Sequence, residues 1–385
     1  MTAPASGAPV VRQSDQREPF VLAVETSRLV HDVRGIGRYV RVLLPKLLTL
    51  HPGLRLILFA RRPADAQTIG RMLPELGIPA NRATVRLRSA MNDTEADVFW
   101  YPWNVAVPAP RRGVVVVTMH DVAPLALPDR RWWKALKNRR WRKRYDATAR
   151  RATLIVTDSA FSAAEIRRTL GVPADRIRVV LLAADEVEVP DAARDAEALS
   201  RLGVRTPFFL VVGAADRRKN IALVERAMPS VMDSHPGATL VLAGPRRGGD
   251  AAAPSWRRTV GYVSDEDLVS LYRSTRALIA PSSYEGFGLP VLEAMQLGAP
   301  VVCTRASSLP EVAGDAALYV GADDAAGLAD AAKRLLDDEA LHASMRSASL
   351  AQSARFSWDA TARQTLAAFE EAAAIGRANA AAGAR

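Results

Sequence analysis

Short apolar runs alternate with helical stretches along almost the whole chain, and this alternation limits the folds that are open to it. The runs form two groups: residues 20–24, 54–60, 98–101, 114–119 and 153–157, then 208–212, 239–243, 259–262, 277–280, 300–303 and 318–320. Strands separated by helices return to the same sheet in parallel. We therefore expect an α/β protein of two doubly wound domains, with ligands bound in a central cleft at the carboxyl ends of the strands.

The breaks in this pattern predict the domain boundaries. Residues 1–18 are polar and lack a hydrophobic segment, so we expect a disordered leader rather than an export signal. Residues 19–190 and 191–360 are the two predicted domains, and residues 361–385 are a C-terminal helix with a frayed tail. Residues 185–198 are the predicted linker. A chain of 385 residues can form two domains that each bury a core.

Cysteine use and hydropathy exclude several other classes of protein. The single cysteine, Cys303, excludes a disulfide framework and indicates a reducing compartment. Because Cys303 follows the apolar run PVV, we expect it to face a core rather than to act as a catalytic thiol. No apolar run approaches the roughly 18 residues that cross a bilayer. We expect a cytoplasmic protein.

The net charge of +11 is concentrated in one segment. Residues 130–151 hold eleven basic residues and one acid, with three tryptophans and a tyrosine between them. A basic helix with interleaved aromatic residues is typical of segments that lie on anionic membranes. A nucleic-acid patch and a solvated face with inward tryptophans are the alternatives. We predict peripheral contact with the inner membrane face and no nucleic-acid partner.

The most specific motif is the run YEGFGLPVLEAM at residues 284–295, where Glu285 and Glu293 bracket a glycine loop and a helix that begins near Pro290. Proline suits a first helical turn, and the free N–H groups of such a loop suit a phosphate. Carboxylates would repel phosphate, so the two glutamates are expected to bind sugar or ribose hydroxyls. The combination predicts a nucleotide-sugar site. A buried strand–turn–helix without a ligand is the structural alternative.

Two further motifs follow strands of the second group. The run DRRKN at residues 216–220 places adjacent cations before a helix, which predicts an anion site. The run GYVSDED at residues 261–267 contains an Asp-x-Asp pattern, which binds a metal in some enzymes. Because it starts a helix, we interpret Ser264 and the acids that follow as a helix cap, and we expect no metal.

The first group of strands carries two more candidates. His120 and Asp121 directly follow the apolar run 114–119, at an end that should open onto the cleft. Gly35 and Gly37 lie between the first strand and a helix predicted over residues 36–50, without the third glycine of a dinucleotide-binding fingerprint. A structural histidine and a simple glycine turn are the alternatives.

The run at residues 284–295 closely resembles the signature of the retaining glycosyltransferases of family 4, which have two Rossmann-like domains in the GT-B architecture. The resemblance covers roughly residues 20–370 and is strongest between residues 261 and 314, where the run SLPEVAG at 308–314 also matches. It implies that Glu285 and Glu293 contact the donor sugar and the ribose. It also implies that the backbone of Phe287, Gly288 and Leu289 holds the diphosphate.

The same resemblance implies roles for the other candidates. It implies that His120 contacts the donor sugar near the anomeric carbon and that Asp121 serves the acceptor side. Gly35 and Gly37 would approach the donor phosphate and the acceptor. Arg218 and Lys219 would neutralise the diphosphate, and Val263 would lie in the segment that meets the base. The sequence departs from many relatives at Ala214, where they carry an arginine, and Arg217 is the alternative to Arg218 as compensation. It also departs at residues 183–185, where they have an asparagine–glycine turn.

The resemblance implies a retaining glycosyltransferase that moves a hexose, with mannose from GDP-mannose as the leading expectation. The acceptor would be a glycan or a lipid-linked glycan in cell-surface polysaccharide synthesis, and neither a cofactor nor a metal is expected. A sugar-nucleotide epimerase of the same architecture would convert the donor without an acceptor. A non-catalytic module that binds membranes or polyanions would explain the basic segment but leave both glutamates without a role.

Overall fold

The computed structural model describes residues 19–32, 35–128, 131–185, 187, 191–244 and 254–383. Two compact units divide the chain: residues 1–100 with 110–113, and residues 101–109 with 114–385. The leader predicted at residues 1–18 lies outside the described residues. The predicted domain boundaries after residues 190 and 360 stay predictions.

The first sheet has seven strands in the order β3-β2-β1-β4-β5-β6-β7. Its registered pairs are parallel. The chain starts at the middle of the sheet, moves outward to β3 and returns to β4 on the other side of β1, which is the doubly wound order. The bounds are β1 Phe20–Glu25, β2 Leu54–Ala60, β3 Ala83–Leu87, β4 Val98–Tyr101, β5 Val115–Thr118, β6 Leu154–Thr157 and β7 Ile177–Val179.

The second sheet has six strands in the order β10-β9-β8-β11-β12-β13, and its pairs are also parallel. The order reverses between β8 and β11, so the loops that follow these two neighbouring strands lead in opposite directions and leave room between them. The bounds are β8 Phe208–Val212, β9 Thr239–Ala243, β10 Arg257–Gly261, β11 Ala277–Ala280, β12 Val301–Thr304 and β13 Ala317–Val320.

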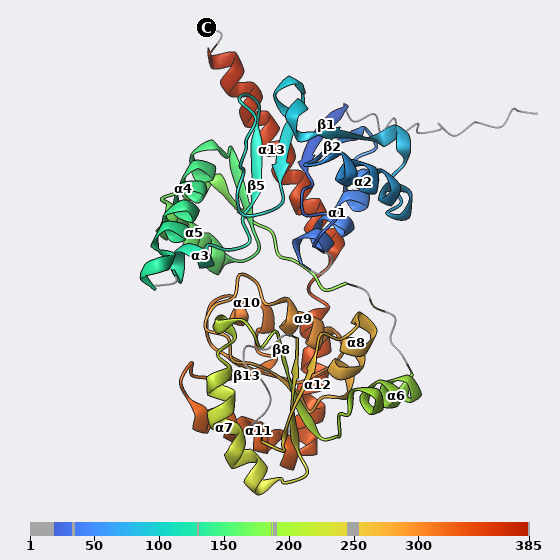
Figure 1. The fold of residues 1–385 in the computed structure, drawn as a ribbon, viewed down its shortest axis with the longest axis vertical. Helices are drawn as coiled ribbons and strands as arrows, with labels where there is room; N and C mark the ends of the chain where they lie inside the picture. The colour runs from blue at the N-terminus through green and yellow to red at the C-terminus, as the bar shows by residue number, and fades with distance from the viewer. Residues whose placement is uncertain are drawn as a thin grey trace, which may run out of the picture. The chain divides into compact units, whose positions relative to one another are not determined.

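Helices connect most successive strands. Figure 1 shows α7 and α11 together beside the second sheet, while α9 packs with α12. The bounds are α1 Ile36–Leu50, α2 Pro63–Glu75, α3 Ala123–Ala126, α4 Ala135–Arg151, α5 Ala160–Leu170, α6 Ala192–Leu202, α7 Ile221–Ser234, α8 Asp265–Ser274, α9 Leu289–Gln296, α10 Leu309–Ala313, α11 Ala325–Asp337, α12 Glu339–Ser353 and α13 Trp358–Gly383. Among the described helices, none combines the length and apolar character needed to cross a bilayer.

Alternate side chains of the second sheet fill a core under α7 and α11. Phe209 and Val211 of β8 belong to this core, together with Leu240 and Leu242 of β9. Successive side chains of a strand point to opposite faces, and both faces of this sheet are covered, so its strands are continuous apolar runs. Cys303 is fully buried, as predicted, and burial raises the pKa of its thiol to about 12.

The predicted α/β fold with two doubly wound sheets is confirmed, and every predicted strand is present to within two residues at either end. Two strands were missed. β3 has a mostly exposed pattern and β7 has only three residues, so neither makes an apolar run. The predicted linker over residues 185–198 is wrong at its C-terminal end, because α6 begins at Ala192 and packs on α8. Residues 186 and 188–190 lie outside the described residues.

The C-terminal helix α13 packs against β5 and β6, and all three elements lie in the second unit. α13 contacts both strands, and Figure 1 shows it beside β5. Its residues Ala362 and Phe369 are buried. The helix continues to Gly383, through residues where fraying was predicted. Residues 384–385 lie outside the described residues.

Candidate functional site

Two loops meet where the strand order of the second sheet reverses. The loop after β8 carries Arg218 and Lys219 in a 3₁₀ turn, Arg217–Lys219, that precedes α7. The loop after β11 carries Glu285. The two backbones are joined directly, because the Ser283 N–H donates to the carbonyl oxygen of Arg218 at 2.8 Å. The doubly wound topology thus brings together side chains that are far apart in the sequence.

Lys219 and Glu285 form an ion pair at this point. The Lys219 Nζ lies 2.7 Å from Glu285 Oε1, and the hydroxyl of Ser282 donates to the same oxygen at 2.7 Å. Only 17% of the lysine side chain and 14% of the glutamate side chain are exposed. A carboxylate in this position is fixed in orientation by two donors, and the ammonium group stays close to any anion that reaches the loop.

The start of α9 presents unused backbone donors beside this pair. Gly288 precedes the helix with a φ of 110°, and a Cβ there would lie 3.0 Å from the Leu309 side chain. Within the described part of the chain, the N–H groups of Phe287, Gly288 and Leu289 have no hydrogen-bond acceptor. Backbone N–H groups at a helix start attract anions. The arrangement can therefore hold a phosphate group, as the sequence predicted.

A row of glycines continues from this loop along the carboxyl edge of the sheet. Gly213, Gly244 and Gly261 lie at the ends of the adjacent strands β8, β9 and β10, with φ values of 80°, 98° and 69°. The Gly244 N–H donates to the Gly261 carbonyl oxygen, and the Gly213 N–H donates to that of Ala243. An edge without side chains allows a flat ligand to approach the backbone closely.

Val263 and Glu293 lie near the two ends of this region. Val263 lies two residues after the end of β10 and is buried, whereas its neighbour Tyr262 is 76% exposed. Glu293 is half-buried on α9 and accepts a hydrogen bond from the Tyr272 hydroxyl at 3.1 Å. Burial, reinforced by the Glu293 carboxylate, raises the pKa of Tyr272. Contact of Val263 with a base and of Glu293 with a ribose stay predictions.

His120 follows β5 and is held by the neighbouring strand ends. Its Nδ1 lies 2.6 Å from Asp158 Oδ2, at the end of β6, and its Nε2 lies 3.1 Å from the carbonyl oxygen of Pro102. Burial lowers the pKa of His120, but Asp158 outweighs burial and the pKa is raised above its ordinary value. Both ring nitrogens face acceptors, and only the protonated ring donates to both.

Asp158 is a functional candidate that the sequence analysis missed. Its signal was available, because Asp158 directly follows the apolar run 153–157 as His120 follows the run 114–119. β5 and β6 are paired in parallel, so these two positions are neighbours in space. A carboxylate that fixes the ring orientation of a histidine is a common partner in catalytic sites.

Arg218 links the β8 loop to Asp121. Its Nη2 lies 2.7 Å from Asp216 Oδ2, and its Nη1 lies 3.4 Å from Asp121 Oδ2. Burial lowers the pKa of Arg218, but Asp216 and Asp121 raise it beyond its usual range. The adjacent Arg217 is exposed. Two of the three cations in this turn therefore already face carboxylates.

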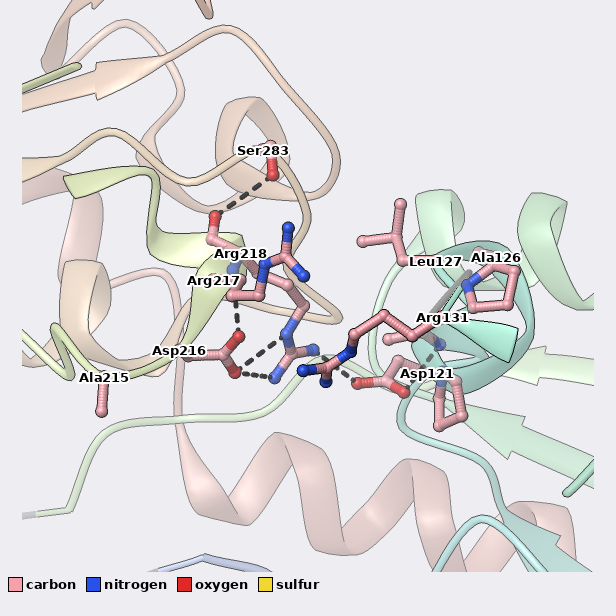
Figure 2. Close-up of a pocket in the computed structure, with 12 residues that line it drawn as sticks. Asp121, Ala126, Leu127, Arg131, Ala215, Asp216, Arg217, Arg218 and Ser283 are labelled. Carbon is pink, nitrogen blue, oxygen red and sulfur yellow. Dashed lines mark hydrogen bonds and ion pairs between the residues drawn. The ribbon is translucent and has the colours of Figure 1, made fainter. Parts of the chain in front are cut away.

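These residues line a pocket of about 1050 Å³ in the second unit. Figure 2 shows Arg218 between Asp216 and Asp121, with Arg131 opposite. Apolar residues form most of one wall, which also carries Asp121 and Arg131, and the other wall is mostly charged, so the pocket suits an amphipathic ligand. The wall residues are Ala123, Pro124, Ala126, Leu127 and Pro128 on the apolar side, and Asp216, Arg217, Arg218 and Ser283 on the polar side.

The Glu285 loop also approaches the backbone of His120 closely. A Cβ on Gly286 would lie 2.6 Å from the His120 carbonyl oxygen, so only glycine fits. Ser162 donates to this carbonyl and to that of Gly286, both at 3.0 Å. The structure therefore brings the predicted catalytic residues His120 and Glu285 into neighbouring loops.

Two predicted caps had different outcomes. Ser264 caps α8 as predicted, because its hydroxyl accepts from the Asp267 N–H. The run SAAE at residues 162–165 has the sequence pattern of a capping box, which predicts a helix that starts at Ser162, and this prediction is wrong. α5 begins at Ala160 with Ser159 as its cap, so Ser162 already lies inside the helix and donates its N–H to the Ser159 hydroxyl. Among the described residues, no group of three or more His, Cys, Asp or Glu side chains is arranged to hold a metal ion.

Gly35 and Gly37 lie in the first unit, at the start of α1. A Cβ on Gly37 would lie 1.9 Å from the Asp32 carbonyl oxygen, and the Gly35 N–H donates to Asp32 Oδ1 at 2.8 Å. The surrounding backbone and the Asp32 side chain therefore give a local structural reason for a glycine at both positions. Residues 33 and 34, between Asp32 and Gly35, lie outside the described residues. The predicted contact of Gly35 and Gly37 with the donor stays a prediction.

The predicted basic helix is present as α4, preceded by a 3₁₀ turn, Trp132–Lys134. Trp133 and Leu136 are 56% and 79% exposed, whereas Tyr145 is buried. Arg144 lies over the Trp141 ring at 5.7 Å. The alternative in which the tryptophans of this segment pack inward is therefore wrong for Trp133. Arg130 lies outside the described residues.

Comparison with known proteins assigns the family. Residues 27–186 match the model of "Glycosyltransferase Family 4", and residues 197–352 match that of "Glycosyl transferases group 1". The chain is 35% identical to O-antigen chain mannosyltransferase B of Escherichia coli over 269 residues, which are 66% of this chain and 70% of that protein. It is 29% identical over 285 residues to the serotype-specific mannosyltransferase WbdA of Escherichia coli, covering 68% of this chain and 34% of WbdA.

Structural comparison agrees. The fold matches a sucrose-phosphate synthase from Thermosynechococcus elongatus with a TM-score of 0.67, at 19% identity, over 92% of this chain and all of the other. That match shows the fold alone, which is the GT-B architecture. These relatives favour neither the epimerase nor the binding module. Since successive parts of the chain match both family models and a relative above 30% identity is covered over two thirds of its length, the chain belongs to the family 4 glycosyltransferases and acts in glycosyl transfer.

Proposed function

We propose that this glycosyltransferase moves mannose from GDP-mannose to a glycan or lipid-linked acceptor in cell-surface polysaccharide synthesis, with retention at the anomeric carbon. The observation that carries the proposal is the ion pair of Lys219 and Glu285 beside the free N–H groups of residues 287–289. The similarity to an O-antigen mannosyltransferase supports the choice of mannose and of a surface polysaccharide.

The donor diphosphate lies, in this proposal, at the N–H groups of Gly288 and Leu289 and near Lys219. It draws Lys219 away from Glu285 and leaves the carboxylate free to accept a sugar hydroxyl. Arg218 adds charge from the side of Asp216. The nucleoside then extends along the glycine edge toward Val263, because adjacent strands are about 4.8 Å apart and two strand spacings match the length of a nucleoside.

The chemical step needs no protein nucleophile. The bond between the anomeric carbon and the phosphate oxygen breaks, and its electron pair stays on that oxygen. Lys219 and the backbone N–H groups stabilise this developing charge. The acceptor hydroxyl attacks on the same face and passes its proton to the departing phosphate. His120, fixed by Asp158, and Glu285 position the sugar, and Asp121 faces the acceptor.

The acceptor side is proposed to lie at a membrane. The pocket beside Arg131 combines apolar lining residues with cationic ones. Leu127, Trp133 and Leu136, which are close to Arg131 in the sequence, are exposed. An anionic bilayer would attract the basic residues of α4 while the exposed apolar side chains enter its interface. The enzyme would then work on the cytoplasmic face, without a metal, because cations of the chain serve the diphosphate.

The test is a donor panel with the full-length protein. Radiolabelled GDP-mannose, GDP-fucose, UDP-glucose and UDP-N-acetylglucosamine are incubated with and without a bacterial membrane lipid extract. We expect label from GDP-mannose in the lipid fraction and, by NMR, a product with the anomeric configuration of the donor. An inverted product would contradict retention. An isomerised donor would indicate the epimerase, and no turnover of any donor would indicate the binding module.

Site variants locate the activity. Lys219→Ala should lower kcat/KM by roughly 100-fold to 1000-fold, as removal of a group that stabilises charge on a leaving oxygen does. Glu285→Gln should lower kcat because it removes a charge that acts on the sugar. Lys333→Ala is the matched control, since Lys333 lies on α11 and contacts Ser230. Wild-type rates in Lys219→Ala would refute the proposed diphosphate site.

A further inference from the structure

The loops after β11 and β12 run side by side in the second sheet. The two strands are paired in parallel, with Ala280 opposite Cys303, so both loops leave the same edge of the sheet. The β11 loop, residues 281–288, carries Glu285. The β12 loop, residues 305–308, carries two adjacent serines that the predicted site did not include.

Hydroxyl groups from β12 and its loop bind the backbone of the Glu285 loop at several points. The Glu285 N–H donates to Ser307 Oγ at 2.9 Å. The Ser308 hydroxyl, which is fully buried, lies 3.0 Å from the Glu285 carbonyl oxygen and 2.7 Å from that of Phe287. Thr304 donates to the carbonyl oxygen of Ser282. The backbone on both sides of the Glu285 side chain is thus held by one neighbouring segment.

Ser307 keeps an unfavourable backbone conformation while it makes this contact. Its φ is 53°, in the left-handed region that glycine adopts readily and most other residues avoid. Its hydroxyl donates to the carbonyl oxygen of Ala306 at 2.7 Å, while the same oxygen accepts from the Glu285 N–H. Strained residues of this kind occur at functional sites more often than elsewhere.

We propose that Ser307 is a positioning residue that sets the orientation of Glu285 for the transferred sugar. Its hydroxyl fixes the Glu285 backbone, while Ser282 and Lys219 fix the carboxylate. Ser308 secures the other end of the same peptide segment. The inference rests on the proposed contact of Glu285 with the donor sugar, and it adds a residue that acts through Glu285 without touching the substrate.

Two substitutions separate the hydroxyl from the backbone strain. Ser307→Gly removes both, and Ser307→Ala removes the hydroxyl and keeps the strain. We expect Ser307→Gly to unfold at a temperature no lower than the wild type, yet to show kcat for GDP-mannose reduced by about tenfold, the size that one hydrogen bond corresponds to. KM should change less, because the substrate contacts themselves remain. Ser347→Ala, which removes an exposed hydroxyl on α12, is the matched control.

Hydrogen exchange supplies a readout that does not depend on the donor. The Glu285 amide should exchange faster in both Ser307 variants, in a peptide that covers residues 283–289. Unchanged exchange would overturn the contact. Faster exchange with a wild-type kcat would overturn the positioning role. If the wild type does not turn over GDP-mannose, the donor under the proposed function is wrong, while the exchange measurement still decides the contact.

A double-mutant cycle tests whether Ser307 acts through Glu285. In the Glu285→Gln background, Ser307→Gly should cause little further loss of kcat, because the carboxylate that it positions is already gone. Multiplicative losses would show that Ser307 affects turnover by another route and would overturn the inference. Wild-type turnover in Glu285→Gln alone would remove the role of both residues.

Discussion

At the scale of single residues, the site is built from side chains that follow neighbouring strands. Lys219 follows β8 and meets Glu285, which follows β11, while His120 follows β5 and meets Asp158, which follows β6. Each pair joins a cation or a histidine to a carboxylate at the carboxyl edge of a parallel sheet. Parallel strands place their carboxyl ends at one edge, so strand order decides which side chains can meet.

The His120–Asp158 pair makes a prediction for pH. The pKa of His120 is raised in the folded state, so the pair stabilises the fold fully below the unfolded value of about 6.5. This stability is lost as pH rises through the higher folded pKa. We expect the melting temperature of the wild type to fall above about pH 6.5, and Asp158→Asn to remove most of this fall, as measured by thermal unfolding across the pH range.

The control for this prediction is Asp337→Asn, which changes an exposed carboxylate that lies 2.8 Å from His235. Solvent screens a pair of this kind, so the pH profile should match the wild type. A profile of Asp158→Asn that runs parallel to the wild type at all pH values would contradict the assigned charge state of His120.

At the scale of elements, helix starts decide how the loops are arranged. α9 begins after a glycine with a positive φ, and among the described residues the N–H groups of Phe287, Gly288 and Leu289 at its start have no acceptor. α5 begins instead with closed donors: Ser159 accepts from Ser162, and Glu311 accepts from the N–H groups of Ala160 and Phe161 at 2.7 Å each. The start of α9 can therefore hold an anion, whereas the start of α5 already binds the carboxylate of Glu311.

The cap of α5 can be tested by unfolding in urea. Ser159→Ala removes the bond from the Ser162 N–H and the bond to the Gly286 carbonyl oxygen, so we expect a loss of about 1–2 kcal/mol in unfolding free energy. Glu165→Ala serves as the comparison, since Glu165 contacts the exposed Arg168 and not the helix start. It should change stability by less than about 0.5 kcal/mol. Equal losses in both variants would restore the capping box.

At the scale of the whole molecule, the net charge is unevenly distributed. Eleven basic residues and one acid fall within residues 130–151, while the chain as a whole has a net charge of +11. Most of the described basic residues of α4 are exposed, although Arg142 pairs with Asp146 at 2.9 Å. A helix with this surface attracts anionic lipids over a distance set by the ionic strength.

Vesicle binding tests the membrane role. Changing Arg139, Arg140, Arg142 and Lys143 to glutamine should weaken binding to phosphatidylglycerol vesicles by roughly 100-fold or more, at about 1 kcal/mol per basic residue. Binding is measured by cosedimentation at low and high salt. The control changes four exposed arginines elsewhere: Arg71, Arg167, Arg334 and Arg363. Equal loss in the two sets would indicate a non-specific charge effect, and undiminished binding would reject the membrane role.

The site was predicted best where residues are close in sequence. Residues 284–295 contain the glycine loop, the helix start and both glutamates, and the helix begins at Leu289, next to the predicted Pro290. The local pattern could mark a residue at a strand end, such as Asp158, but it could not show which residues of distant strands meet. Asp158 and Ser307 were missed because their meaning depends on which strand lies beside β5 and beside β11.

The order of the amino acids was enough to predict the α/β class, the strands that form buried runs and the family motif. Burial on both faces of a sheet requires continuous apolar residues, which are visible in the sequence. It could not show β3 and β7, which carry little apolar signal, or the cap of α5 at Ser159. The pairing of Lys219 with Glu285 and the contact of Ser307 with the Glu285 backbone became visible only in the folded chain. These contacts join segments 66 and 22 residues apart, and strand order rather than local propensity brings such segments together.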